Sequence, residues 1–470
     1  MQRICYGFFT LLLSLVFVSV LAAQEYAGSE TCKTCHAAIY DTFIKTGHPH
    51  KLTKINGAPP VFPDSTSPGV PNPPADKTWD DISYLIGGFG WKARFMDSEG
   101  YILTGDSIRQ YNLAKAHLGL DAHWIGYDPD KAPRKPYTCG SCHTTGWVAT
   151  GENGPHQDSL PGIYGTWVEP GVRCEACHGP AKAHTLDPTN VKPPKTENCA
   201  DCHIRGDVNM IDATGGKNVK HHEQYEELLA SPHKSFKCGT CHDPHKSTIY
   251  DMGGFKGEDQ TCKTCHASME IKIADMQGLS CYTCHMAYAG KSADAITINY
   301  KGGSVSEGDL HSHIFRITKD TTWQFITDDG KYVRKDAEGK AYLTMDFTCL
   351  TCHTDESMSW AAANAEAVHG TGTAIRITPK TLPKHFALKQ NFPNPFNPTT
   401  TIAFDLPEAT HIRLAIYTVD GQLVRTILNR KMPAGAHRIT LNSENLASGI
   451  YIYTLTTKNF SDSKKMMVLK

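Results

Sequence analysis

A five-residue pattern, Cys-x-x-Cys-His, occurs eight times in this chain of 470 residues. Two of the copies lie in an identical heptapeptide, TCKTCHA, at residues 31–37 and 261–267. The pattern uses sixteen of the 17 cysteines, and the remaining one is Cys5. Apart from Cys5, no cysteine is therefore left for disulfides, for a catalytic thiol or for a further metal site.

The spacing of the pattern indicates covalent haem attachment. Two thiols about one helical turn apart reach two vinyl groups on one porphyrin edge, and the histidine then approaches the iron from the same side. Zinc sites also use Cys-x-x-Cys pairs, but they do not need a histidine directly after the second cysteine. Because all eight copies have this histidine, the sequence predicts eight covalently bound c-type haems.

The attachment and proximal residues follow directly from the pattern. The predicted attachment residues are Cys32, Cys35, Cys139, Cys142, Cys174, Cys177, Cys199, Cys202, Cys238, Cys241, Cys262, Cys265, Cys281, Cys284, Cys349 and Cys352. The predicted proximal iron ligands are His36, His143, His178, His203, His242, His266, His285 and His353.

Histidines are numerous enough to fill the second axial position of every iron. Of the 24 histidines, eight are proximal and three lie at or beyond residue 385, so thirteen remain. We expect bis-His haems of low potential, with the distal ligands His48, His117, His184, His222, His233, His245, His313 and His369. Four close pairs leave the choice open: His48 or His50, His117 or His123, His221 or His222, and His311 or His313.

Two of these candidates cannot ligate the haem of the preceding motif. Proximal and distal ligands approach opposite faces of one porphyrin, whereas His245 follows His242 by three residues and His184 follows His178 by six. We therefore expect His184 and His245 to serve neighbouring haems. One backbone segment then holds two haems close together, as fast electron transfer requires.

The first 23 residues have the features of a signal peptide. Arg3 precedes the apolar run FFTLLLSLVFVSVLAA, which ends in small residues at Ala22 and Ala23. The run is short for a transmembrane helix, although a retained anchor is the alternative. Export agrees with haem attachment, which takes place outside the cytoplasm in bacteria.

Residues 24–380 contain all eight motifs. At this density the haems themselves are expected to form the core, in a mainly α and irregular domain with small β inserts. We expect one insert at DISYLIGG, WKARFMD and GYILTG, within residues 81–105, and another at residues 323–345. The formal net charge of −1 gives no indication of nucleic-acid binding.

Residues 386–470 have no cysteine and alternate between apolar and polar positions. Short strands separated by Asp-Gly and Ala-Ser-Gly turns predict a small antiparallel β-sandwich domain. A carbohydrate-binding or spacer domain is one interpretation. The domain also resembles the C-terminal sorting domain of the bacterial type IX secretion system, through NFPNPFNPTTTI (391–402), YTVDGQLV (417–424), LASGIYIYTL (446–455) and the terminal KKMMVLK. This resemblance implies contact with the secretion machinery and delivery from the periplasm to the cell surface or beyond.

The haem motifs resemble those of the multihaem cytochrome c superfamily, which includes octahaem hydroxylamine oxidoreductase and octahaem tetrathionate reductase. The similar segments are GSETCKTCHAAIYDTFIKTGH, YTCGSCHTTGW, VRCEACHGPAKAH, KCGTCHDPH, LSCYTCHMA and HSHIFRI. The resemblance implies that family's haem packing and His–His coordination. Many of its reductases replace the histidine of one motif by lysine, whereas all eight motifs here keep histidine.

These features predict a secreted octahaem cytochrome that transfers electrons at or outside the cell surface. Its expected partners are redox proteins or extracellular electron acceptors, with self-association as a further possibility. The alternative is an oxidoreductase that acts on nitrite, hydroxylamine or a sulfur oxyanion at one five-coordinate haem. The unmodified motifs and the supply of distal histidines favour electron transfer.

Overall fold

The computed structural model describes most of the chain after the predicted signal peptide. Residues 1–23 lie outside the described part, which comprises residues 25–63, 67–193, 199–251, 253–370, 383, 385–432, 434–443 and 446–469. Within these ranges, no helix has the length and apolar character needed to cross a membrane.

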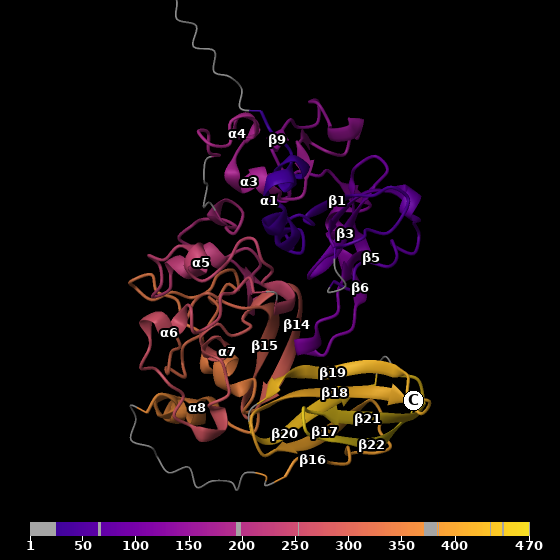
Figure 1. Ribbon diagram of the computed structural model, residues 1–470. Helices are drawn as coiled ribbons and strands as arrows, with labels where there is room; N and C mark the ends of the chain where they lie inside the picture. Colours follow the sequence, from indigo (N-terminus) through magenta and orange to yellow (C-terminus); the bar gives the residue numbers. More distant parts are fainter. Residues whose placement is uncertain are drawn as a thin grey trace, which may run out of the picture.

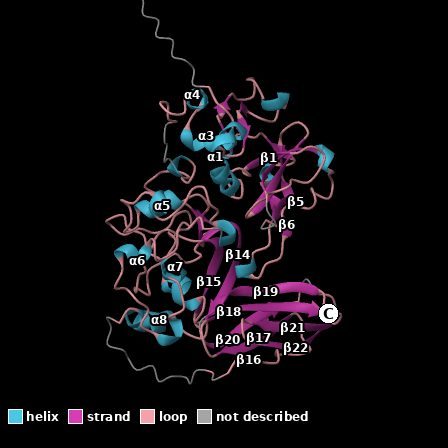
Figure 2. Cartoon of the chain, viewed as in Figure 1, coloured by secondary structure: helices cyan, strands magenta, loops and turns pink. Residues whose placement is uncertain are grey.

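Helices in the haem region are short and are scattered among loops (Figure 2). They are α1 (Ser29–Phe43), α2 (Gly140–His143), α3 (Cys174–His178), α4 (Lys182–Leu186), α5 (Gln224–Leu229), α6 (Cys262–Cys265), α7 (Cys281–His285) and α8 (Met358–Asn364). Only α1 is longer than seven residues. The prediction of a mainly α domain is therefore wrong. An attachment motif needs about one helical turn, and without an extended apolar face nothing stabilises longer helices.

A seven-stranded sheet occupies the first haem-free stretch and is larger than the small insert expected there. Its strands are β1 (Leu52–Lys54), β2 (Ile82–Gly87), β3 (Lys92–Asp97), β4 (Ile102–Leu103), β5 (Gly105–Asn112), β6 (His123–Tyr127) and β7 (Arg134–Lys135). The order is β1-β2-β3-β4-β7, and β5 joins β3 to β6. Tyr84, Phe95 and Met96 are fully buried in this sheet, and because the adjacent residues Phe95 and Met96 point to opposite faces, β3 is covered on both faces rather than alternating between buried and exposed residues.

The second large insert lies at a different place from the one predicted. A long antiparallel hairpin of β14 (Gly290–Tyr300) and β15 (Gly303–Leu310) extends the short strands β12 (Ala213–Thr214) and β13 (Asn218–Lys220). Residues 323–345, where strands were expected, form isolated bridges only, such as Ile326 to Val333. Two small sheets pair β8 (Thr144–Thr145) with β11 (Glu169–Pro170) and β9 (Val148–Ala149) with β10 (Gly165–Thr166).

The C-terminal segment folds as the predicted antiparallel sandwich (Figure 1). One sheet contains β16 (Ala387–Leu388), β17 (Thr399–Leu406) and β20 (Gly435–Asn442). The other contains β19 (Leu423–Met432), β18 (Thr410–Thr418), β21 (Gly449–Thr456) and β22 (Ser461–Val468). Side chains from both sheets, including Phe404, Leu414 and Tyr453, share one buried core. The sequence did not predict β16 or β22.

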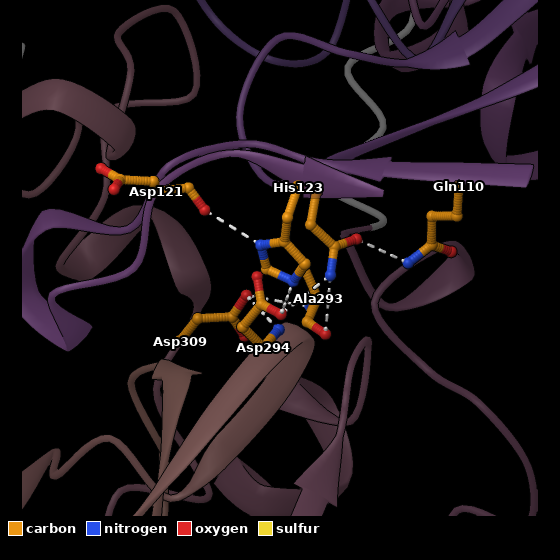
Figure 3. A network of polar contacts seen from close by, with 7 residues as sticks. Gln110, Asp121, His123, Ala293, Asp294 and Asp309 are labelled. Carbon is orange, nitrogen blue, oxygen red and sulfur yellow. Dashed lines mark hydrogen bonds and ion pairs between the residues drawn. The ribbon is translucent and has the colours of Figure 1, made fainter. Parts of the chain in front are cut away.

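A polar network joins the seven-stranded sheet to the hairpin (Figure 3). His123 lies 3.2 Å from a carboxylate oxygen of Asp294, and Asn112 donates a hydrogen bond to the same side chain at 2.8 Å. The carboxylate of Asp309 accepts hydrogen bonds from the backbone amides of Ala293 and Asp294. These contacts fix the two inserts against each other.

The His123–Asp294 pair predicts a pH-dependent contribution to stability. The hydrogen bond to Asp294 raises the pKa of His123 above 6.5, so this stabilisation is full below about pH 6.5 and is lost as pH rises through the raised pKa. His123 is 39% exposed, so solvent weakens the ion pair. We therefore expect His123→Gln to lower the free energy of unfolding at pH 6 by only about 0.5–1 kcal/mol. Thermal unfolding at pH 6 and pH 9 measures the difference, which should shrink at pH 9. The control is His156→Gln, and an equal loss at both pH values would contradict the assignment.

Candidate haem sites

Every attachment motif begins on or beside a helical turn. Helices α1, α2, α3, α6 and α7 carry five motifs, and the others start on the 3₁₀ turns η5 (Cys199–Asp201) and η6 (Cys238–Thr240) and on the π turn η9 (Asp346–Leu350). Residues three apart on a helix share a face, so each pair of thiols points the same way. None of the sixteen thiols forms a disulfide in the described part of the chain. The identical heptapeptides also have the same backbone at the histidine, with φ −116° and ψ 38° at His36 and φ −110° and ψ 42° at His266.

Six motif histidines face another histidine at a nearly constant distance. A metal between two imidazoles lies about 2 Å from each nitrogen, and the nitrogen lies about 1 Å from its ring centre, so the ring centres are about 6 Å apart. The observed centres are 6.1–6.3 Å apart in the pairs His36–His184, His178–His245, His203–His48, His242–His313, His266–His233 and His285–His369. The spacing fits a haem iron between the two rings of each pair.

Hydrogen bonds at the other ring nitrogen support this fit. Nδ1 of His184, His285 and His369 lies 2.6–3.0 Å from the backbone carbonyl oxygen of Val191, Phe315 and Glu270, respectively. Metal-binding histidines usually make such a bond with the nitrogen that does not face the metal. In these three residues Nε2 is therefore the nitrogen available to an iron.

His184 and His245 each lie beside a motif other than the one that precedes them in the chain. His184 follows the third motif but faces His36 of the first, and His245 follows the fifth but faces His178 of the third. Their segments thus connect haem sites that are distant in sequence.

Two motif histidines, His143 and His353, have no histidine ring at this distance within the described residues. The ring centre of the predicted distal ligand His222 lies 5.8 Å from that of His203. The neighbouring residue His221 lies close to Arg205, and the charge of Arg205 also lowers the pKa of His143. His117 stacks on Tyr288 at 4.2 Å and lies near Arg430, as Cys352 of the last motif does. His222 and His117 therefore stay predictions for these two irons.

The other members of the close pairs have contacts of their own. Nε2 of His50 lies 2.8 Å from the carbonyl oxygen of Ile44, and its ring stacks on Phe89. His123 pairs with Asp294, as described above. His311 stacks on Tyr288 at 3.9 Å. These protein contacts explain the positions of the three rings, and none of them requires an iron ligand.

The motifs form a continuous series through the molecule. The thiols of Cys32 and Cys174 lie close together, as do those of Cys142 and Cys202. The following further pairs lie close enough for their charges to interact: Cys177 with Cys199, His203 with His242, Cys241 with Cys262, Cys262 with Cys281, and Cys284 with Cys349. The order of motifs in space is thus first, third, fourth, fifth, sixth, seventh and eighth, with the second beside the fourth.

Glu175, a residue within the third motif, fixes the beginning of this series. Its carboxylate accepts hydrogen bonds from the backbone amides of Ala27 and Gly28, both at 2.8 Å, and of Ala181 at 2.7 Å. Glu175 is 2% exposed. It therefore holds the start of α1 against α3, and no sequence pattern distinguishes this glutamate from the others.

Cationic side chains surround the second motif. Burial lowers the pKa of His143 to about 3, and the charges of Lys51, Arg94 and Arg205 add to this effect. None of these three cations forms an ion pair with a carboxylate of the described residues. Nδ1 of His143 is buried without a hydrogen-bond partner there. The site therefore contains cations without carboxylate partners and a ring nitrogen without a hydrogen-bond acceptor among the described residues. Such a site favours the binding of an anion.

Zinc binding finds no support in the arrangement of the ligands. A structural zinc site needs four tetrahedral ligands. No group of three or more His, Cys, Asp or Glu side chains in the described ranges is arranged to hold a metal ion. The two-sided histidine pairs fit a porphyrin iron instead.

Three family models match parts of the chain. Residues 390–469 match the secretion system C-terminal sorting domain, residues 127–204 match cytochrome c7 and related cytochrome c, and residues 231–271 match a doubled CXXCH motif. The sorting-domain match coincides with the sandwich. The two cytochrome matches cover five of the eight motifs.

Individual relatives are distant. The chain is 22% identical over 235 residues to dissimilatory sulfite reductase MccA of Wolinella succinogenes, covering 39% of this chain and 33% of that protein. It thus spans about a third of the length of this curated relative. The crystal structure of the outer cell wall cytochrome OcwA is 16% identical, with a TM-score of 0.41 over 73% of this chain and 86% of that one. PorZ, from the type IX secretion system of Porphyromonas gingivalis, is 16% identical, with a TM-score of 0.14 over 22% of this chain and 13% of that one.

Motifs, fold and family models together define a class of protein: a multihaem c-type cytochrome. More particularly, it is a cytochrome with a C-terminal type IX sorting domain, exported to the cell surface or beyond. The predictions of multiple covalent c-type haems, of type IX secretion and of this location are confirmed. The sorting domain implies contact with the secretion machinery.

Replacing a distal histidine should open one iron. In His369→Ala, we expect one additional high-spin ferric haem per molecule by EPR, because the ring opposite His285 is lost. The matched control is His156→Ala, whose Nδ1 lies 2.6 Å from the carbonyl oxygen of Ile163 and which faces no motif. Identical spectra of the His369→Ala and wild-type proteins would contradict the assignment.

Proposed function

We propose that residues 24–380 hold eight haems in one electron-transfer series at or outside the cell surface. The observation that carries the proposal is that neighbouring motifs lie close to one another from Cys32 to Cys352, combined with the six histidine pairs. The resemblance of the motifs to those of octahaem hydroxylamine oxidoreductase also supports a shared haem packing. Redox proteins or extracellular acceptors are the expected partners.

The protein positions and insulates the redox centres. Each haem, when bound, supplies a one-electron iron couple whose potential is low with two histidine ligands. The chain contributes paired thiols, opposing imidazoles and the buried carboxylate of Glu175, which keeps the first and third motifs together. Glu227 lies 3.9 Å from Nδ1 of His313, and burial raises the pKa of its carboxyl group to about 8.

The spin state of the irons tests this function. If every iron has two histidine ligands, the oxidised protein should give an essentially low-spin EPR spectrum, and the reduced protein should bind no significant CO. Rapid mixing with substoichiometric reductant should then spread electrons among all the haems. A high-spin signal equal to one haem in eight would show that one iron is open.

The cationic second motif supports a second candidate function, the reduction of a small oxyanion. Lys51 is half-buried, and desolvation lowers the pKa of its ammonium group. Arg94 donates from Nε to Gln110 at 2.7 Å, and its guanidinium lies 3.6 Å from the ring centre of Tyr127. Unpaired cations at fixed positions favour nitrite or a sulfur oxyanion over neutral hydroxylamine. Sulfite is included because one relative is named as a sulfite reductase.

Substitution of Lys51 tests this second function. On the oxyanion hypothesis, Lys51→Met should weaken the binding of sulfite or nitrite about tenfold, because one fixed positive charge is lost. Binding is measured as perturbation of a high-spin haem signal. The control is Lys331→Met, a lysine that is 70% exposed. Equal anion affinity in both variants, or a wild-type protein without an anion-sensitive haem, would contradict the oxyanion hypothesis and leave electron transfer as the one proposed function.

A further inference from the structure

The sorting domain packs directly on the haem region through β19. In Figure 1, β19 is the strand of the sandwich nearest to β6, β14 and β15. It lies against the 3₁₀ turn η2 (Ala116–Leu118) and Gly119. Gly119 has φ +67°, and a Cβ atom there would overlap the carbonyl oxygen of Ile427. The two backbones are therefore in direct contact, and only glycine fits at this point.

The contact is charged, with cations on β19 and carboxylates on the haem region. Nη1 of Arg430 donates to a carboxylate oxygen of Glu307 at 2.9 Å, and Glu307 is only 5% exposed. Lys431 donates to the carbonyl oxygen of Gly278. Arg425 lies close enough to Asp121 for their charges to interact. A basic strand thus covers an acidic surface.

The last motif of the series lies directly beneath this strand. The thiol of Cys352 is near both Arg430 and Glu307, and Cys349 and Cys352 are near Cys284 of the seventh motif. His117, the predicted distal ligand of the last haem, also lies in the field of Arg430. The sandwich therefore covers the end of the proposed electron path.

The buried ion pair is incomplete. The second carboxylate oxygen of Glu307 and Nε of Arg430 are buried and have no hydrogen-bond partner among the described residues. Reversing the charge of either partner would place two like charges together in this buried contact.

We propose that the acidic face under β19, formed around Asp121 and Glu307, is the surface where the last haem exchanges electrons with a basic redox protein. The sorting domain covers this face in the full-length chain and serves as a cap until it undocks. This inference rests on the proposed electron-transfer function and adds to it an exit site and the charge of the partner.

A charge reversal in the full-length protein tests the cap. Arg430→Glu places a second carboxylate beside Glu307, so we expect faster hydrogen exchange at Ala116–Leu118 and in β19. The double variant Glu307→Arg/Arg430→Glu restores opposite charges and is the matched control, in which exchange should return to the wild-type rate. Unchanged exchange in Arg430→Glu would overturn the claim that this pair holds the cap.

The electron-exchange role is tested with the same variant by stopped-flow oxidation of the reduced protein. Hexaammineruthenium(III), a trivalent cation, serves as the probe of a basic partner, and ferricyanide is the anionic control. In Arg430→Glu, we expect the oxidation phase that corresponds to about one haem in eight to be about tenfold faster than in the wild type with hexaammineruthenium(III), and unchanged with ferricyanide. Undocking without this acceleration would overturn the proposal. Failure of electrons to equilibrate among the haems of the wild-type protein would instead refute the proposed function itself.

Discussion

In six of the eight motifs, the motif histidine faces a second imidazole with the ring centres 6.1–6.3 Å apart, and we propose that each such pair holds one iron. The proximal ring comes from a local motif, but the distal ring comes from elsewhere: His369 lies 84 residues after its partner His285, and His184 lies 148 residues after His36. On this proposal, iron ligation joins distant segments of the haem region, in addition to the apolar clusters of that region.

The molecule also has several apolar clusters, and one of them, formed by Met345, Leu350 and Ala361, adjoins the eighth motif. Another belongs to the sandwich, and others lie in the seven-stranded sheet and around the β14–β15 hairpin. The network of His123, Asn112 and Asp294 then joins the two inserts.

The sequence predicted what depends on local chemistry. Attachment cysteines, proximal histidines and most strands of the sandwich follow from short spacings and alternation. It did not predict the β14–β15 hairpin, because GKSADAITINY and GGSVSEGDL alternate only in part. Glu175, Lys51 and Arg430 were missed for another reason. Their roles come from contacts across the fold, since a carboxylate or a lone cation has no characteristic spacing in sequence.

Anomalous X-ray diffraction at the iron absorption edge of the exported protein tests the central claim most directly. The account predicts eight iron peaks, six of them midway between the named histidine pairs and about 2 Å from a nitrogen of each ring. The other two should lie beside His143 and His353. Fewer than eight peaks, or peaks displaced from the space between paired rings, would contradict it.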